Sequence, residues 1–182
     1  MSQPTNIKLL AAAEQVLLSA GVTGLTVRRV GEVSGLNPTL ITYHFGTMGQ
    51  LLDQLCEHNL APMRAAWLGL DGAVVADANG LLRQWLGPLL APAAFTPHGR
   101  ALVVLDEIAS HGEDTLRDRL FAEMAGVARR VRQSLAPHLP HLADEELAGR
   151  LRFIAGAALG PPPRSRALAP TATGAELDAL CR

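Results

Sequence analysis

The first part of the chain has the periodicity of an amphipathic helix. Between residues 7 and 20, apolar side chains fall three and four positions apart, at Leu9, Leu10, Ala13, Val16 and Leu17. This spacing places them on one face of a helix. Gly21 comes directly after this stretch, where glycine favours the turn that ends a helix. We therefore expect a first helix over residues 7–20 with one buried face.

Two short helices are expected next, each with its own start and stop signals. Thr26 is placed as an N-cap, with Leu25 and Val30 at the spacing of a hydrophobic staple. The helix that it starts should cover residues 27–34 and end at Gly35. Asn37 can cap a third helix, whose first position would be taken by Pro38.

The third helix should end near residue 46, because a new helix start follows at once. Thr47 and Gln50 stand three residues apart, which is the spacing of a capping box. Beyond this point we expect helices near residues 47–67, 77–90, 98–110, 113–135 and 144–159. Prolines at positions 62 and 88 are expected to kink or end two of them. No strand pattern bounded by hairpin turns is present, so the predicted fold class is all-α.

Composition narrows the class of protein. The chain has 182 residues, 48% hydrophobic and 18% charged, which favours a folded helical protein over a disordered one. The 16 basic and 17 acidic side chains give a net charge of -1, so any nucleic-acid binding must be local. The two cysteines form no disulfide framework, and the apolar runs are interrupted by charges or prolines. We therefore expect a cytoplasmic protein without a membrane partner.

The second and third helices, joined at Gly35, form a candidate helix-turn-helix. At about 100° per residue, Ile41 and Phe45 share the face of the third helix that must turn toward the core. The outward side then carries Thr39, Leu40, Thr42 and Tyr43, with His44 near the border of the core. Hydroxyl groups can bond base edges, and an aliphatic side chain can contact a thymine methyl group. This surface suits the major groove of DNA better than it suits water.

The same residues resemble a known family. The runs LLAAA at 9–13, TVRRVG at 26–31, GL at 35–36, LITYHFGT at 40–47 and LL at 51–52 look like the N-terminal domain of the TetR (tetracycline-repressor) family. Several motifs at the right spacing carry the resemblance. It implies a helix-turn-helix domain over residues 1–46 and a helical ligand-binding and dimerisation domain over residues 47–160. A Pro-rich C-terminal tail would occupy residues 161–182.

The resemblance also implies a function and its partners. The expected protein is a ligand-responsive repressor that binds a palindromic double-stranded DNA operator as a homodimer and releases it when an unidentified small-molecule effector binds. No cofactor, metal or catalytic residue is expected. The expected DNA-contacting residues are Thr26, Arg28, Asn37, Thr39, Leu40, Thr42, Tyr43, His44 and Thr47.

Three departures from the family pattern stand out. Where members carry a phosphate-contacting lysine at the start of the fourth helix, this chain has Met48. Gly31 replaces the usual alanine inside a helix, at an expected cost of about 0.5–1 kcal/mol. The charges of the first 50 residues are Lys8, Arg28 and Arg29 against Glu14 and Glu32, so 3 - 2 gives only +1. This is a weak basic footprint for a DNA-binding domain.

Residues of the C-terminal part suggest a pocket and an interface. Large apolar side chains that would suit a ligand cavity or a plain core are Trp67, Trp85, Phe95, Phe121, Met124 and Phe153. A stripe at helical spacing that would suit a dimer interface comprises Leu151, Ile154, Ala155 and Ala158. The pair His138 and His141 lacks a third metal ligand nearby. The alternative function is an all-helical small-molecule binding protein with weak or vestigial DNA binding.

Overall fold

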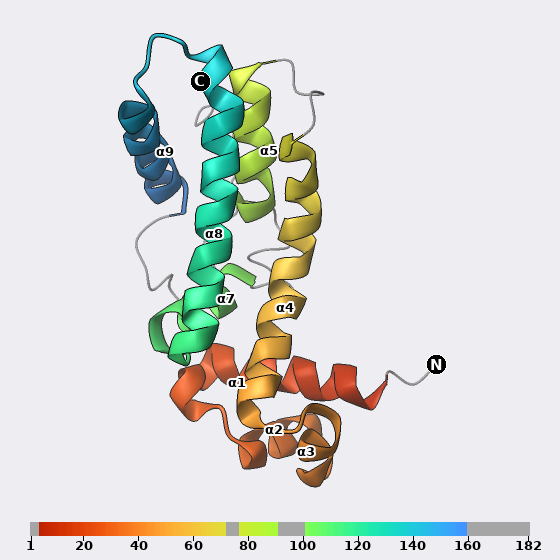
Figure 1. Ribbon diagram of the computed structural model, residues 1–182. Coiled ribbons are helices and arrows are strands. Elements are labelled where there is room, and N and C mark those ends of the chain that lie inside the picture. The colour runs from red at the N-terminus through yellow and green to blue at the C-terminus, as the bar shows by residue number, and fades with distance from the viewer. Residues whose placement is uncertain (1–3, 72–76, 91–100, 160–182) are drawn as a thin grey trace.

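The computed structural model describes residues 4–71, 77–90 and 101–159, except for the side chains of Asp71, Ala158 and Leu159. Every regular element in these ranges is a helix, which confirms the predicted all-α fold (Figure 1). The elements are α1 (Thr5–Gly24), α2 (Val27–Ser34), α3 (Thr39–Phe45), α4 (Met48–Trp67), η1 (Leu68–Asp71), α5 (Ala78–Leu90), α7 (Ala101–His111), α8 (Asp114–Leu135), η2 (Ala136–His138) and α9 (Asp144–Leu159).

The predicted bounds of α2 and the predicted start of α4 are confirmed by their caps, whereas α1 is longer than expected and α3 begins at Thr39, one residue later than expected. Thr26 Oγ1 accepts a hydrogen bond from the Arg29 N–H at 3.3 Å, and α2 ends at Gly35, whose φ is 66°. Both hydrogen bonds of the Thr47–Gln50 capping box are formed. Gly21 has the left-handed φ expected of a terminator, 72°, but it kinks α1 rather than ending it, because a further turn follows as far as Gly24.

Two apolar clusters organise the molecule. The N-terminal core joins α1, α2, α3 and the start of α4 through Leu9, Ala12, Ala13, Val16, Val30, Ile41 and Leu51. The main core joins α4, α5, α7, α8 and α9, and Leu17 of α1 belongs to it. In Figure 1, α1 crosses the lower end of the molecule, with α2 and α3 below it and α4 and α8 rising above it. Helix α1 therefore contributes to both clusters.

The two helical prolines do not end their helices. Pro62 lies inside α4 and Pro88 inside α5, and each helix continues beyond its proline. By length and composition alone, α1 is apolar enough to cross a membrane, contrary to the expectation from the sequence. This is weak evidence for a membrane span, because core helices pass the same test and Leu9, Ala13 and Leu17 are buried inside this protein.

Candidate nucleic-acid interface

The turn between α2 and α3 depends on two glycines. Gly35 adopts a left-handed φ that favours glycine over other residues. Gly31 lies against the start of α3, and a Cβ atom at this position would stand 2.7 Å from Pro38 Cγ. The expected cost of Gly31 relative to alanine therefore does not hold here, because alanine would push α2 away from Pro38.

The outward face of α3 is open to solvent. The Tyr43 side chain is 81% exposed, whereas Ile41 is 1% exposed and belongs to the N-terminal core. Thr39, Thr42 and His44 are also exposed, so His44 lies farther from the core than its helical angle suggested. Leu40 is only half-exposed and packs against the N-terminal core. It presents less surface to a groove than expected.

Three of the expected DNA-contacting residues have their side-chain oxygens engaged in capping. Thr26 accepts from the Arg29 N–H, and Thr47 Oγ1 accepts from the Gln50 N–H at 3.1 Å. Asn37 Oδ1 accepts from both the backbone N–H and the hydroxyl of Thr39, at 3.0 and 2.9 Å. These side chains fix the starts of α2, α3 and α4 and so determine how the outward face of α3 is presented.

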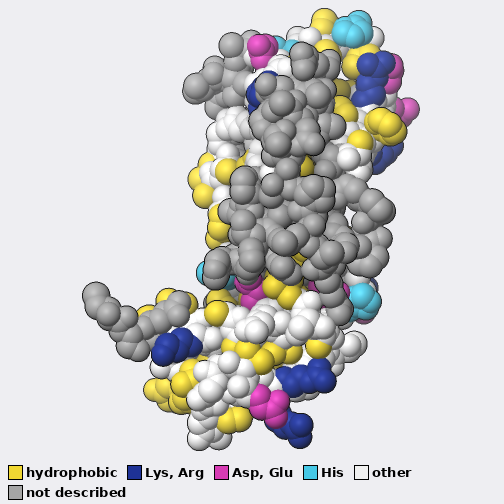
Figure 2. Space-filling view, turned by 180° about the vertical axis from the view of Figure 1, so that it is seen from behind, with side chains coloured by type: hydrophobic (Ala, Val, Ile, Leu, Met, Phe, Trp, Pro, Cys, Tyr) yellow, Lys and Arg dark blue, Asp and Glu magenta, His cyan; other side chains and the backbone are white. Residues whose placement is uncertain are grey.

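Basic charge at this end is small and partly neutralised. Arg28 is 86% exposed, and its Nε lies 3.0 Å from Glu32 Oε1 one turn along α2. Arg29 Nη1 donates to the Gly24 carbonyl at 3.4 Å. Figure 2 shows only scattered Lys and Arg side chains at the lower end of the molecule. Arg28 can contact DNA only by leaving or sharing Glu32.

A two-helix motif with a buried inner face and an exposed aromatic and hydroxyl face defines a helix-turn-helix DNA-binding protein. Residues 9–55 match the family model described as "Bacterial regulatory proteins, tetR family". Residues 9–55 thus form a TetR-family DNA-binding domain, and the resemblance seen in the sequence is confirmed over these residues.

The other comparisons add little. Among solved structures, the chain is similar to the TetR family repressor AlkX from Dietzia sp. strain DQ12-45-1b, described as implicated in biodegradation of n-alkanes, with 16% identity and a TM-score of 0.42. The alignment covers 98% of this chain and 91% of that one. No curated protein matches the chain.

A cavity of about 290 Å³ lies in the C-terminal part, between α4, α5, α7, α8 and α9. Four of the expected pocket residues line it: Trp67, Trp85, Phe121 and Met124. Phe153 is not among the lining residues and is 79% exposed, and Phe95 lies outside the described residues.

The indole Nε1–H of Trp67 donates to the Trp85 carbonyl at 2.9 Å, which fixes one wall of the cavity. Met63 and the α7 residues Leu102, Leu105 and Asp106 also line the cavity, and no pattern in the sequence marks them as pocket residues.

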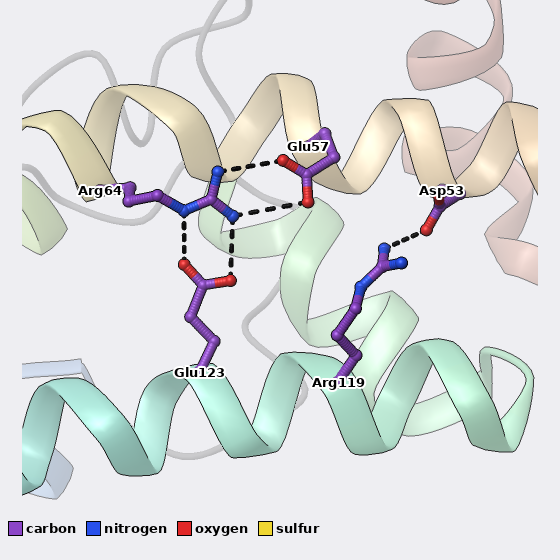
Figure 3. A network of polar contacts seen from close by, with 5 residues as sticks. All are labelled: Asp53, Glu57, Arg64, Arg119 and Glu123. Carbon is purple, nitrogen blue, oxygen red and sulfur yellow. Dashed lines mark hydrogen bonds and ion pairs between the residues drawn. The ribbon is translucent and has the colours of Figure 1, made fainter.

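Ion pairs connect α4 to α8 (Figure 3). Arg64 donates from Nε and Nη2 to both carboxylate oxygens of Glu123, at 2.6 and 2.9 Å, and from Nη1 to Glu57 at 3.0 Å. These hydrogen bonds raise the pKa of Arg64, so the guanidinium stays charged. Arg119 pairs with Asp53 nearer the start of α4. Helix α4 therefore has fixed contacts along much of its length.

Part of the stripe on α9 expected to form a dimer interface packs on the subunit's own core. Leu151 is 6% exposed and belongs to the main core, and Ile154 and Ala155 pack against it. The side chain of Ala158 is outside the described residues. The reason is that α9 packs on α5 and α8 of the same chain. Within the described residues, no group of three or more potential metal ligands occurs.

Proposed function

We propose that the protein is a ligand-responsive repressor that binds a palindromic operator as a homodimer. The observation that carries the proposal is the contrast on α3, where Tyr43 is exposed and Ile41 is buried. An exposed aromatic ring between exposed hydroxyl groups is explained by insertion into a DNA groove. Base contacts come from Arg28, Thr39, Leu40 and Tyr43, and phosphate contacts come from Thr26, Thr42, His44 and Thr47.

The ligand response is supported by helices that belong to both ends of the molecule. Helix α4 begins at the Thr47 cap beside α3 and reaches the cavity at Met63 and Trp67. Helix α7 lines the cavity with Leu102 and Leu105 and packs against α1. A molecule that enlarges the cavity shifts these helices and changes the position of α3. The proposed domain division at residue 46 places the DNA-contacting face before α4 and the cavity after its start.

The test is a footprint on DNA upstream of the protein's own gene. We expect protection of two half-sites about one helical turn apart. Tyr43→Ala should weaken operator binding by about 1–3 kcal/mol while leaving the thermal unfolding midpoint unchanged. Ile41→Ala is the matched control on the other face, and it should lower stability by about 2 kcal/mol or more. Normal operator binding by Tyr43→Ala would contradict the assignment of this face.

A second candidate function is an all-helical small-molecule binding protein whose DNA-binding domain is vestigial. The Arg28–Glu32 ion pair and the absence of a lysine at position 48 favour it. The two functions differ in one result, because only the first predicts salt-dependent binding to a specific DNA sequence.

A further inference from the structure

The apolar cavity continues into a charged groove. A second hollow, of about 370 Å³, lies between α5, α8 and α9. Its lining shares Trp85, Ala128 and Ala155 with the apolar cavity, so the two spaces meet along these side chains. Its described lining also includes Arg129, Arg132 and Arg152 and no carboxylate. An apolar space and a cationic space are thus adjacent.

The hydrogen-bonding state of these arginines suits an anionic group. Arg132 Nε lies 3.2 Å from Asp144 Oδ1, but the two groups are not aligned, and this buried Nε has no hydrogen-bond partner among the described residues. A buried donor without a partner needs an explanation. No ion pair is recorded for Arg129 or Arg152 in the part of the chain that the structure describes. Three guanidinium groups thus line one groove, and an anion between them would offset their positive charge.

The different charges of the cavity and the groove determine how a bound molecule is oriented. Among the described residues, Asp106 on α7 is the one charged residue that lines the apolar cavity. The apolar walls suit a hydrocarbon chain, whereas the arginines of the groove favour a negative group. Resting on the ligand response proposed above, we propose that the effector is a single-chain amphipathic anion. Its apolar chain lies among Trp67, Trp85 and Met124, and its carboxylate or phosphate head lies between Arg129, Arg132 and Arg152.

Tryptophan emission provides a direct readout. The chain has two tryptophans, and both line the apolar cavity. We would titrate the full-length protein, without DNA, with decanoate, decyl phosphate and 1-decanol, following emission and, in parallel, heat by calorimetry. Decanoate or decyl phosphate should bind at least about tenfold more tightly than decanol, as expected for charge-assisted hydrogen bonds. The order of the two anions tells a carboxylate site from a phosphate site. Each methylene added from octanoate to decanoate should tighten binding about fourfold.

Matched variants separate the head group from the chain. The double variant Arg129→Gln/Arg152→Gln should lose the preference for the anions and keep the affinity for decanol. Arg150→Gln, an exposed arginine of α9 that pairs with Glu146 and lies outside the groove lining, should keep both. Sedimentation of the same samples distinguishes a change of oligomeric state from loss of the head-group contact.

Three results would overturn the proposal: equal binding of decanol and the anions, an undiminished preference in the double variant, or neither emission change nor heat with any of the three compounds. A band-shift assay with operator DNA distinguishes failure of this proposal from failure of the proposed function. Anion binding by a protein that binds no DNA would support the site and contradict the repressor function. Anion binding that leaves a DNA complex intact would support the site and contradict the coupling.

Discussion

The carboxylate of Glu107 accepts a hydrogen bond from the backbone N–H of Val22, with 3.1 Å between Oε1 and the nitrogen. Val22 directly follows the kink at Gly21, where the regular helical hydrogen bonding of α1 is interrupted. Glu107 belongs to α7, the helix whose other side chains line the apolar cavity. His111 Nδ1 lies 3.4 Å from the same oxygen. This bond connects the DNA-binding end directly to a cavity-lining helix.

Glu107→Ala should lower the free energy of unfolding by about 1–3 kcal/mol, because it removes the acceptor of a partly buried N–H. Glu107→Gln keeps an acceptor oxygen and should lose less. His111→Ala removes only the half-exposed partner and should have little effect. Urea denaturation of the three variants measures these differences. Equal losses in Glu107→Ala and His111→Ala would mean that the Val22 bond contributes nothing.

Glu32→Gln should strengthen DNA binding and make it more sensitive to salt. The change releases Arg28 from its ion pair, and each additional phosphate contact adds about 0.9 to the slope of log affinity against log salt. The slope should therefore rise by up to about one unit per half-site. Fluorescence anisotropy over a salt series measures it.

Arg28→Gln provides the control for this prediction. In the Arg28→Gln background, Glu32→Gln should give a smaller gain, because no guanidinium is left to release. An identical gain in both backgrounds would show that Glu32 acts only by repelling DNA.

Cys56 is expected to make the protein less stable at alkaline pH. Burial of the thiol is the main cause that raises its pKa from 9.0 to about 11. Below pH 9 the thiol is neutral in both the folded and the unfolded chain, so its contribution to stability is fully present. Between pH 9 and 11 the unfolded chain ionises first, and stability falls by up to about 2–3 kcal/mol.

The measurement is denaturation at pH 8 and pH 10, compared with Cys56→Ala, in which this part of the pH dependence should disappear. A thiol reagent applied to the Cys181→Ser variant should modify Cys56 only as fast as the protein opens, because the folded thiol is buried and protonated. Rapid modification at pH 8 would contradict the raised pKa.

Features set by neighbouring residues were predictable from the sequence, and features set by distant contacts were not. The caps at Thr26 and Thr47 and the opposite orientations of Ile41 and Tyr43 depend on spacing within a few positions, and the structure agrees with them. The contact of Gly31 with Pro38 depends on how closely two helices approach, which spacing does not encode. The bond between Glu107 and Val22 joins residues 85 positions apart.

Helix α9 shows a different limit of sequence patterns. Its apolar stripe was correctly placed on one face, yet periodicity does not distinguish a face that packs on the same chain from one that packs on a partner. Leu151 and Ile154 turned out to contact the subunit's own core. The charged groove next to them could not be predicted from the sequence, because its three arginines come from two helices and meet only in the folded protein.

The dimer contact proposed for α9 should therefore lie on the opposite face, around Phe153. This side chain is 79% exposed, and the next residues on that face, Gly156 and Ala157, are small enough for a second helix to approach closely. One helix per subunit makes a small interface, which buries about 1,200 Å² of accessible surface in total. The dimer should therefore be weak and concentration-dependent.

Phe153→Arg should give a folded monomer that loses cooperative operator binding, because it places an unpaired charge in the interface. Its unfolding free energy, measured under conditions where the wild type is monomeric, should stay within about 0.5 kcal/mol, as for most surface substitutions. Ile154→Arg is the neighbouring control: it buries a charge against the main core and should lower stability in the monomer itself. Sedimentation equilibrium and thermal melts of both variants distinguish the two faces. The opposite result would be a Phe153→Arg protein that remains dimeric and an Ile154→Arg protein that folds normally as a monomer. It would show that the dimer interface lies on the apolar stripe.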